Sequence, residues 1–245
     1  IGKSYGGSYF DGLIDHLYIV RNSPLNGEIA AHIAESPVLN LHLDEDLTTT
    51  SFVDDTPLAN NATCSPSTGS GAGCPQAGTK GQMREAVVFV GNGERLTVAD
   101  DPAYNLDEFT LGLWIKPQNR RAKTQPIIGK WDETTGGNRN YALFLDADNR
   151  VRLSIQTSDC TTYKATTSAI ALLDGQWNHV MATFDDEAMR IYINGSLDAN
   201  ELAFTGRLCR TLLPITIGGG DAFATWDGFD GAMDEITLHG VALNA

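Results

Sequence analysis

The feature that most constrains this sequence is a strict alternation of apolar and polar residues in many short runs. The runs 109–116, 151–156, 189–193 and 213–217 all show it, and Gly, Asn, Asp or Pro bounds each of them. A period of two places the apolar side chains on one face of a β-strand. No long helical pattern alternates with these runs, so the chain is predicted to fold as an all-β antiparallel sandwich rather than a doubly wound sheet.

Turn signals and chain length agree with this prediction. Asp148-Asn149 and Asn194-Gly195 each lie between two strand-like runs, and such pairs favour tight hairpins. A chain of 245 residues can form one large sandwich. One short segment, 26–35, has helical spacing, with Asn26 as a plausible cap and Pro37 as its stop.

The charge of the chain restricts its partners. The formal net charge is −14. An acidic surface repels phosphate backbones and anionic lipid heads, so we expect no binding to nucleic acid. No apolar stretch approaches the roughly 20 residues that a membrane helix needs, so we expect no membrane insertion. The same charge suits solubility, and it also suits divalent cations.

The four cysteines, Cys64, Cys74, Cys160 and Cys209, indicate a disulfide framework. Four cysteines allow three pairings. Cys64 and Cys74 flank a loop rich in Ser, Gly and Pro, which suggests a stapled hairpin loop, and Cys160 would then pair with Cys209 across the fold. No Cys-x-x-Cys pair is present, which argues against zinc. Two disulfides imply an oxidising compartment, so we expect an extracellular or cell-surface location.

A sequence echo suggests a tandem array. The segment 10–17, FDGLIDHL, returns as 229–236, FDGAMDEI. One sandwich has a single place for its closing strand, so both copies cannot occupy it in one domain. We therefore predict that residues 1–36 hold the closing strand of a preceding repeat plus a linker helix. Residues 38–245 would form one complete repeat, and the chain would be a piece of a longer protein.

Several segments together resemble a known family. The chain is similar to the concanavalin-A-like laminin-G and pentraxin jelly rolls, especially the laminin-G-like repeats of large secreted bacterial proteins. The matching segments are LNLHLDE at 39–45, AVVFVG at 86–91, FTLGLWIKP at 109–117, LDGQWNHV at 173–180, RIYING at 190–195 and FDGAMDEI at 229–236. The resemblance covers nearly all of 38–245 and implies a jelly-roll β-sandwich.

The resemblance also implies a structural Ca²⁺ ion that bridges the first and last strands. Calcium takes six to eight oxygen ligands, commonly carboxylates and loop carbonyls. We expect Asp44 and Asp234 as its main ligands, with Asp54 and Asp55 as further candidates. Strand alternation places Asp234 on the same face as Ile236, pointing inward, where it needs a partner. Backbone amides could supply that partner instead of a cation.

Two loops carry the chemistry of a sugar site. Sugar rings stack on flat aromatic faces, while amides and charged groups read their hydroxyls. The segments 130–140 and 223–227 combine tryptophan with such groups, and the same tryptophans could instead pack against the sandwich or a neighbouring repeat. The residues predicted to contact a ligand are Trp131, Asp132, Asn138, Arg139, Trp226 and Asp227.

No catalytic residue is predicted. The chain lacks a Gly-x-Ser-x-Gly nucleophile elbow. It also lacks the alternating carboxylates on one strand that would give a glycoside hydrolase its pair, so a hydrolase is the least favoured interpretation. We therefore predict a non-catalytic adhesion or carbohydrate-binding module of a surface protein, whose partners are a carbohydrate or a surface protein and its neighbouring repeats. The alternative is a purely structural repeat of a stalk, sheath or filament, built by repeat-to-repeat contacts or by donation of a strand to a neighbour.

Overall fold

The computed structural model describes residues 35–64, 73–118, 123–133, 139–219 and 228–243, which belong to one compact unit, Glu35–Ala245. The predicted segment 10–17 and the linker helix before residue 35 lie outside the described residues. The first strand, β1 (Pro37–Leu41), begins next to the start predicted for the complete repeat.

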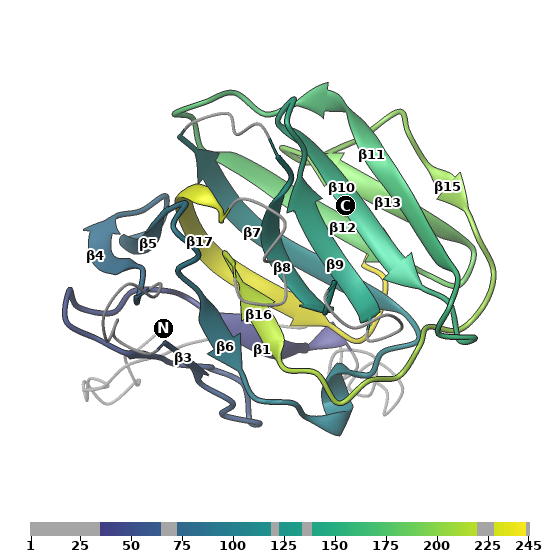
Figure 1. Cartoon of the computed structure of the whole chain (residues 1–245), viewed down its shortest axis with the longest axis horizontal. Helices are drawn as coiled ribbons and strands as arrows, with labels where there is room; N and C mark the ends of the chain where they lie inside the picture. The colour runs from purple at the N-terminus through teal and green to yellow at the C-terminus, as the bar shows by residue number, and fades with distance from the viewer. Residues whose placement is uncertain (1–34, 65–72, 119–122, 134–138, 220–227, 244–245) are drawn as a thin grey trace, which may run out of the picture. The chain divides into compact units, whose positions relative to one another are not determined.

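Two antiparallel sheets form the predicted sandwich (Figure 1). The nine-stranded sheet runs in the order β14 (Ser196–Leu197), β13 (Ala188–Ile193), β12 (Asn178–Phe184), β7 (Phe109–Pro117), β17 (Asp230–His239), β5 (Glu85–Val90) and β4 (Gln76–Lys80). In it β1 also pairs with β17, and β15 (Leu202–Ala203) pairs with β13. The eight-stranded sheet runs β11 (Tyr163–Ala171), β10 (Arg150–Gln156), β9 (Arg139–Leu145), β8 (Gln125–Trp131), β16 (Ile215–Ile217), β6 (Leu96–Val98), β3 (Ala62–Thr63) and β2 (Ser51–Phe52). A 3₁₀ turn, η1 (Pro102–Tyr104), follows β6.

The core lies between the sheets and follows from the alternation in the sequence. Both sheets contribute to one buried cluster, which includes Leu111 and Leu113 of β7, Leu143 of β9 and Leu153 of β10. The predicted hairpins are present as well, since β9 joins β10 and β13 joins β14. Asn194 has a φ of 52° in the second turn, the left-handed conformation that asparagine tolerates well.

The prediction that Asp234 points inward on the same face as Ile236 is wrong, because a β-bulge lies between the two residues. The register between β17 and β7 shifts just after Asp234, where Glu235 has a φ of 51°. A bulge inserts one extra residue and restarts the alternation. Ile236 therefore faces the core, whereas Asp234 lies opposite Trp114 on the outer face of the nine-stranded sheet.

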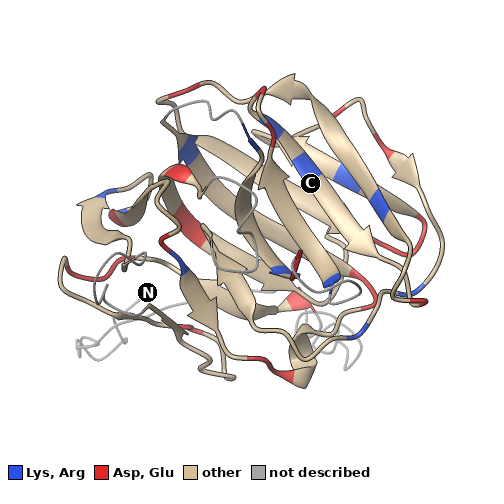
Figure 2. Ribbon diagram, viewed as in Figure 1, with Lys and Arg blue, Asp and Glu red and all other residues tan. Residues whose placement is uncertain are grey.

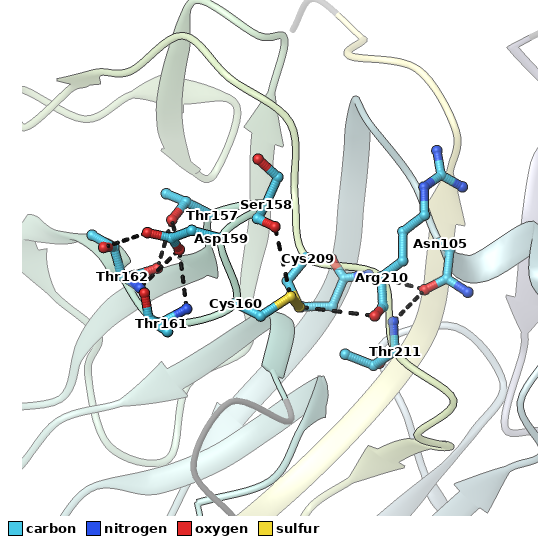
Figure 3. The surroundings of a disulfide bond; sticks show 11 residues. Asn105, Thr157, Ser158, Asp159, Cys160, Thr161, Thr162, Cys209, Arg210 and Thr211 are labelled. Atoms are coloured by element: carbon cyan, nitrogen blue, oxygen red, sulfur yellow. Dashed lines mark hydrogen bonds between the residues drawn. A yellow bond between two sulfur atoms is a disulfide. The ribbon is translucent and has the colours of Figure 1, made fainter.

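Both predicted disulfides are present, Cys64–Cys74 and Cys160–Cys209. The second joins the turn after β10 to the segment that precedes β16 (Figure 3). The Cys209 amide also donates to the Gln156 carbonyl at 2.9 Å. Disulfides persist in oxidising compartments, which indicates a location outside the cytoplasm. In the part of the chain that the structure describes, no helix is long and apolar enough to cross a membrane.

Candidate functional site

A pocket of about 360 Å³ lies on the outer face of the eight-stranded sheet, over β8 to β11. The alternation along β9 shows which face of the sheet this is. Leu143 and Leu145 belong to the main core, so Phe144 between them faces outward. Phe144 forms a separate small cluster with Trp131 and Ala142. We call this site the β8–β11 pocket, and its lining residues are Trp131, Glu133, Arg139, Arg152, Ser154 and Tyr163.

Trp131 forms the base of the β8–β11 pocket. Its ring packs edge-on against Phe144, with centroids 5.8 Å apart, and the Arg139 guanidinium covers it 5.4 Å from the ring centroid. Only 4% of Trp131 is exposed. The indole is therefore buried by its own chain, so its burial does not point to a contact with a neighbouring repeat.

Glu133 ties the tryptophan and the arginine together. The indole Nε1 of Trp131 donates to Glu133 Oε1 at 2.7 Å, and Arg139 Nη2 donates to Glu133 Oε2 at 2.5 Å. Arg139 Nε also donates to the Asp132 carbonyl at 3.4 Å. Both carboxylate oxygens of Glu133 are thus engaged, which fixes the guanidinium over the indole.

Arg152 supplies a second guanidinium to the same pocket. It lies 4.8 Å above the ring of Phe144, its partner in the register of β9 and β10. Burial lowers the pKa of Arg152, while nearby Tyr163 and Glu133 act in the opposite direction. Arginine stays protonated under all such conditions, so this side chain brings a fixed positive charge to the pocket.

The charge of this region differs from that of the whole chain. Figure 2 shows Lys and Arg on the strands β10 and β11, in a chain whose net charge is −14. Arg150 and Arg152 belong to β10, and Lys164 belongs to β11. Strand alternation directs Arg150 and Arg152 to the outer face, whereas Lys164 lies opposite the core residue Ile155 and over the ring of Phe204.

Asp44 and Asp234, the two main calcium ligands predicted, both hold the turn between β4 and β5. Asp234 Oδ2 accepts hydrogen bonds from the amides of Gln82 and Met83, each at 2.8 Å. Asp44 Oδ1 accepts one from the amide of Glu85 at 3.1 Å. The turn is thereby fastened to the segment after β1 and to the middle of β17, which is the amide-capping alternative for Asp234.

Burial raises the pKa of Asp234 to about 6. The two amide bonds lower it, whereas the charges of Glu235 and Asp44 raise it further. Its second oxygen, Oδ1, is buried and accepts no hydrogen bond from the described residues. Among those residues no group of three or more His, Cys, Asp or Glu side chains is placed to hold a metal ion. The calcium ion stays a prediction.

The other two candidate ligands lie in the loop after β2 and fit a metal less well. Asp54 accepts four hydrogen bonds, from the amides of Asn40, Thr56 and Asn60 and from the Thr56 hydroxyl. Its carboxylate is therefore occupied as a loop cap. Asp55 lies 3.6 Å from the Nε2 of His42.

Of the predicted ligand residues, Trp131 and Arg139 meet in the β8–β11 pocket, and the Asp132 carbonyl supports Arg139. Asn138, Trp226 and Asp227 lie outside the described residues. Sequence reasoning missed four residues of the pocket. These are Glu133, Arg152, Ser154 and Tyr163.

Residues 90–245 match the laminin-G family model of the concanavalin A-like lectin/glucanase superfamily. Mouse pappalysin-1 is 26% identical over 169 residues, which is 64% of this chain and 10% of that protein. Human pappalysin-1 is 28% identical over 120 residues, which is 45% of this chain and 7% of that protein. The chain thus spans about a tenth or less of these curated relatives.

Solved structures show the same fold at low identity. Domain 4 of AbnA, an extracellular arabinanase from Geobacillus stearothermophilus solved with arabinotriose, has a TM-score of 0.64 and 19% identity, covering 86% of this chain and 95% of that one. The ligand-binding domain of botulinum neurotoxin serotype D, solved with N-acetylneuraminic acid, has a TM-score of 0.60 and 15% identity, covering 87% and 50%.

Proposed function

Because the chain belongs to the concanavalin A-like lectin/glucanase superfamily, we propose that it is a non-catalytic carbohydrate-binding module of an extracellular or cell-surface protein, and that the sugar occupies the β8–β11 pocket. Folds of this kind host many functions, so the proposal depends on the site rather than on the fold.

The composition of the β8–β11 pocket carries the proposal. Tyr163 is 59% exposed at its edge, which gives a sugar ring an aromatic face on which to stack. Ser154 and the two guanidinium groups lie beside it as hydrogen-bonding groups. A shallow aromatic surface with a few fixed polar groups is the usual chemistry of a sugar site.

Two structural neighbours support a carbohydrate ligand. One was solved with arabinotriose and the other with N-acetylneuraminic acid. At 19% and 15% sequence identity, these neighbours share only their fold with this chain. Which sugar binds therefore has to be inferred from the residues of this pocket.

The arrangement of carboxylates supports a binding role over catalysis. Glycoside hydrolases need two carboxylates on either side of the scissile bond. Among the described residues, Glu133 is the one carboxylate that lines the β8–β11 pocket, and Trp131 and Arg139 occupy both of its oxygens. A carboxylate held in this way positions its neighbours and is poorly placed to attack a sugar.

We also propose a bracing Ca²⁺ ion between the segment after β1 and the middle of β17, beside Asp44 and Asp234. The buried Oδ1 of Asp234 is the oxygen that fits best, and Asp44 is close enough for its charge to raise the pKa of Asp234. Carbonyls and water would have to complete the shell. Asp54 is left out of the proposed set because four donors already occupy it.

A glycan array screened with the full chain, once with calcium and once with a chelator, tests the proposal. Tyr163→Ala should lose binding to the glycans that the natural chain selects, because it removes the exposed ring. Tyr192→Ala is the matched control, since Tyr192 lies on β13 in the other sheet and should bind normally. Absence of binding in both conditions would refute a carbohydrate site and favour the structural-repeat alternative.

A further inference from the structure

We propose that Asn194 is an N-glycosylation site and that the first sugar of its glycan packs on the ring of Tyr192. The chain contains two Asn-x-Ser/Thr sequons, at 61–63 and at 194–196. In the secretory pathway of a eukaryotic cell, such a triplet accepts an N-linked glycan. That pathway is also an oxidising compartment, in which the two disulfides of this chain would form.

The turn that carries Asn194 leaves room for a glycan. Asn194 and Gly195 form the two-residue turn between β13 and β14, in which Ile193 pairs with Ser196. Asn194 is exposed. A Cβ atom placed on Gly195 would meet no other heavy atom of the described chain within 4 Å. The folded domain therefore tolerates a bulky group at this turn.

The side-chain amide of Asn194 is held in one orientation. Its Oδ1 accepts a hydrogen bond from the amide of His179 at 2.9 Å, and its Nδ2 donates to Asn178 Oδ1 at 3.4 Å. Glycosylation replaces one of the two hydrogens on Nδ2, so the nitrogen still has a hydrogen to donate. The orientation that the unmodified side chain has in the turn is therefore compatible with a glycan.

The transfer itself needs a lipid-linked oligosaccharide diphosphate as the sugar donor. A bond forms between Nδ2 of Asn194 and C1 of the first sugar, while the bond from C1 to the phosphate oxygen breaks. The lipid diphosphate leaves with the bonding electrons, and the displaced amide proton is lost to a base. No oxidant or reductant takes part.

Tyr192 faces the same side of the sheet as Asn194. Ile193 between them belongs to the core, so alternation directs both of its neighbours to the outer face of the nine-stranded sheet. Tyr192 is half-buried, and its cross-strand partners Met181 and Leu197 flank it on the same face. Leu197 is 53% exposed. An aromatic ring with apolar neighbours thus lies next to Asn194 and offers a sugar ring a surface for stacking.

The sequon at Asn61 is an internal comparison. Asn61 is also exposed, and its Oδ1 accepts a hydrogen bond from the amide of Asp54 at 3.0 Å. The residue two positions before it is Ala59, which has no ring. A glycan at Asn61 would therefore lack the stacking partner that Tyr192 gives to a glycan at Asn194.

The first test measures whether Asn194 is modified. The full chain and its Ser196→Ala variant would be secreted from a human cell line that adds high-mannose glycans, and peptide mass spectrometry would give the occupancy of each sequon. Ser196→Ala destroys the acceptor but keeps the Asn194 side chain, so it is the matched control. We expect a glycan on Asn194 in the natural chain and none in Ser196→Ala. An unmodified Asn194 in the secreted natural chain would overturn the proposal.

The second test asks whether the sugar packs on Tyr192. Thr63→Ala removes the other sequon, and its melting temperature would be measured for three forms of the chain. These carry the whole glycan, the first sugar alone after endoglycosidase treatment, or no glycan after production in a bacterial periplasm. The first two forms should melt about 2–4 °C above the third. Adding Tyr192→Ala should remove most of that difference.

The remaining outcomes concern the packing on Tyr192. Ser196→Ala, which keeps only the sequon at Asn61, should differ by less than about 1 °C between its glycosylated and unglycosylated forms. The packing would be contradicted if the Asn194 glycan left the melting temperature unchanged or raised it equally in Tyr192→Ala. Loss of the difference after trimming to the first sugar would contradict it too, because the outer sugars would then be the source of the stabilisation.

Discussion

Arg139 covers Trp131 from its partner position on the neighbouring strand. The two residues are opposite each other in the register of β8 and β9, and the guanidinium lies 5.4 Å from the indole centroid. The sequence predicts that Trp131 contacts a sugar, but this stacking buries its indole at the base of the pocket. The aromatic surface left for a ligand is that of Tyr163.

The first prediction separates the roles of these two aromatic residues. Trp131→Ala should lower the free energy of unfolding by about 3–5 kcal/mol, because it leaves a cavity beside Phe144. Tyr163→Ala should change that free energy little, because its ring is mostly exposed. Urea denaturation of both variants measures the difference. Equal stability of the two variants would contradict the packing described for Trp131.

The second prediction concerns the ion pair between Asp100 and Lys130, the residue before Trp131 on β8. The fully buried Lys130 Nζ donates to Asp100 and to the carbonyls of Thr211, at 2.9 Å, and Leu213, at 2.6 Å. Lys130→Met should therefore cost about 3–5 kcal/mol in the free energy of unfolding, since it leaves three acceptors without their donor. Chemical denaturation checks this value. The double variant Lys130→Met/Asp100→Asn should lose less free energy of unfolding than the sum of the losses in the two single variants.

The third prediction is a pH dependence that comes from Asp234. Burial raises its pKa to about 6 in the folded protein, above the ordinary value of 3.8, so the folded state binds this proton more tightly than the unfolded chain. The resulting stabilisation is complete below the ordinary pKa and is lost as the pH rises through about 6.

Asp234→Asn should remove that contribution, which we expect to be about 1–3 kcal/mol. The comparison with the natural chain is essential, because His42 also titrates nearby. Burial lowers the pKa of His42, but Glu235, Asp55 and Asp44 together raise it above its ordinary value. Thermal unfolding across this pH range, without and with calcium, gives the measurement. Calcium should raise the melting temperature of the natural chain and not that of Asp234→Asn. Identical pH profiles for both proteins would refute the role given to Asp234.

The fourth prediction compares the two disulfides. Cys160–Cys209 closes 49 residues of chain and Cys64–Cys74 closes 10. Loop entropy in the unfolded chain makes the first worth about 4 kcal/mol and the second about 3 kcal/mol. Replacing both cysteines of one bridge by serine should therefore lower the free energy of unfolding, and the loss should be larger for Cys160–Cys209 than for Cys64–Cys74. A larger loss at Cys64–Cys74 would contradict this ranking.

Much of the fold was predictable because its signal is local. Alternation in 109–116 and 151–156 corresponds to β7 and β10, and both cysteine pairs formed as predicted. The bulge at Glu235 was not predictable, because a single residue in a left-handed conformation leaves no apolar signature. The face assigned to Asp234 was wrong for that reason.

The pocket was only half predictable, because it depends on strand pairing. Trp131 and Arg139 belong to one loop-like segment, whereas Arg152 and Tyr163 join them through the pairing of β9, β10 and β11. A signal for Arg152 and Ser154 did exist in the sequence. Both lie at the polar positions of β10, and these positions face outward once the apolar ones are assigned to the core.

The location of a bound sugar tests the central claim most directly. We would determine a crystal structure of the full chain with the glycan that binds most tightly on the array. The account predicts a sugar ring against Tyr163 in the β8–β11 pocket. A sugar bound instead on the outer face of the nine-stranded sheet, beside Trp114, would contradict it.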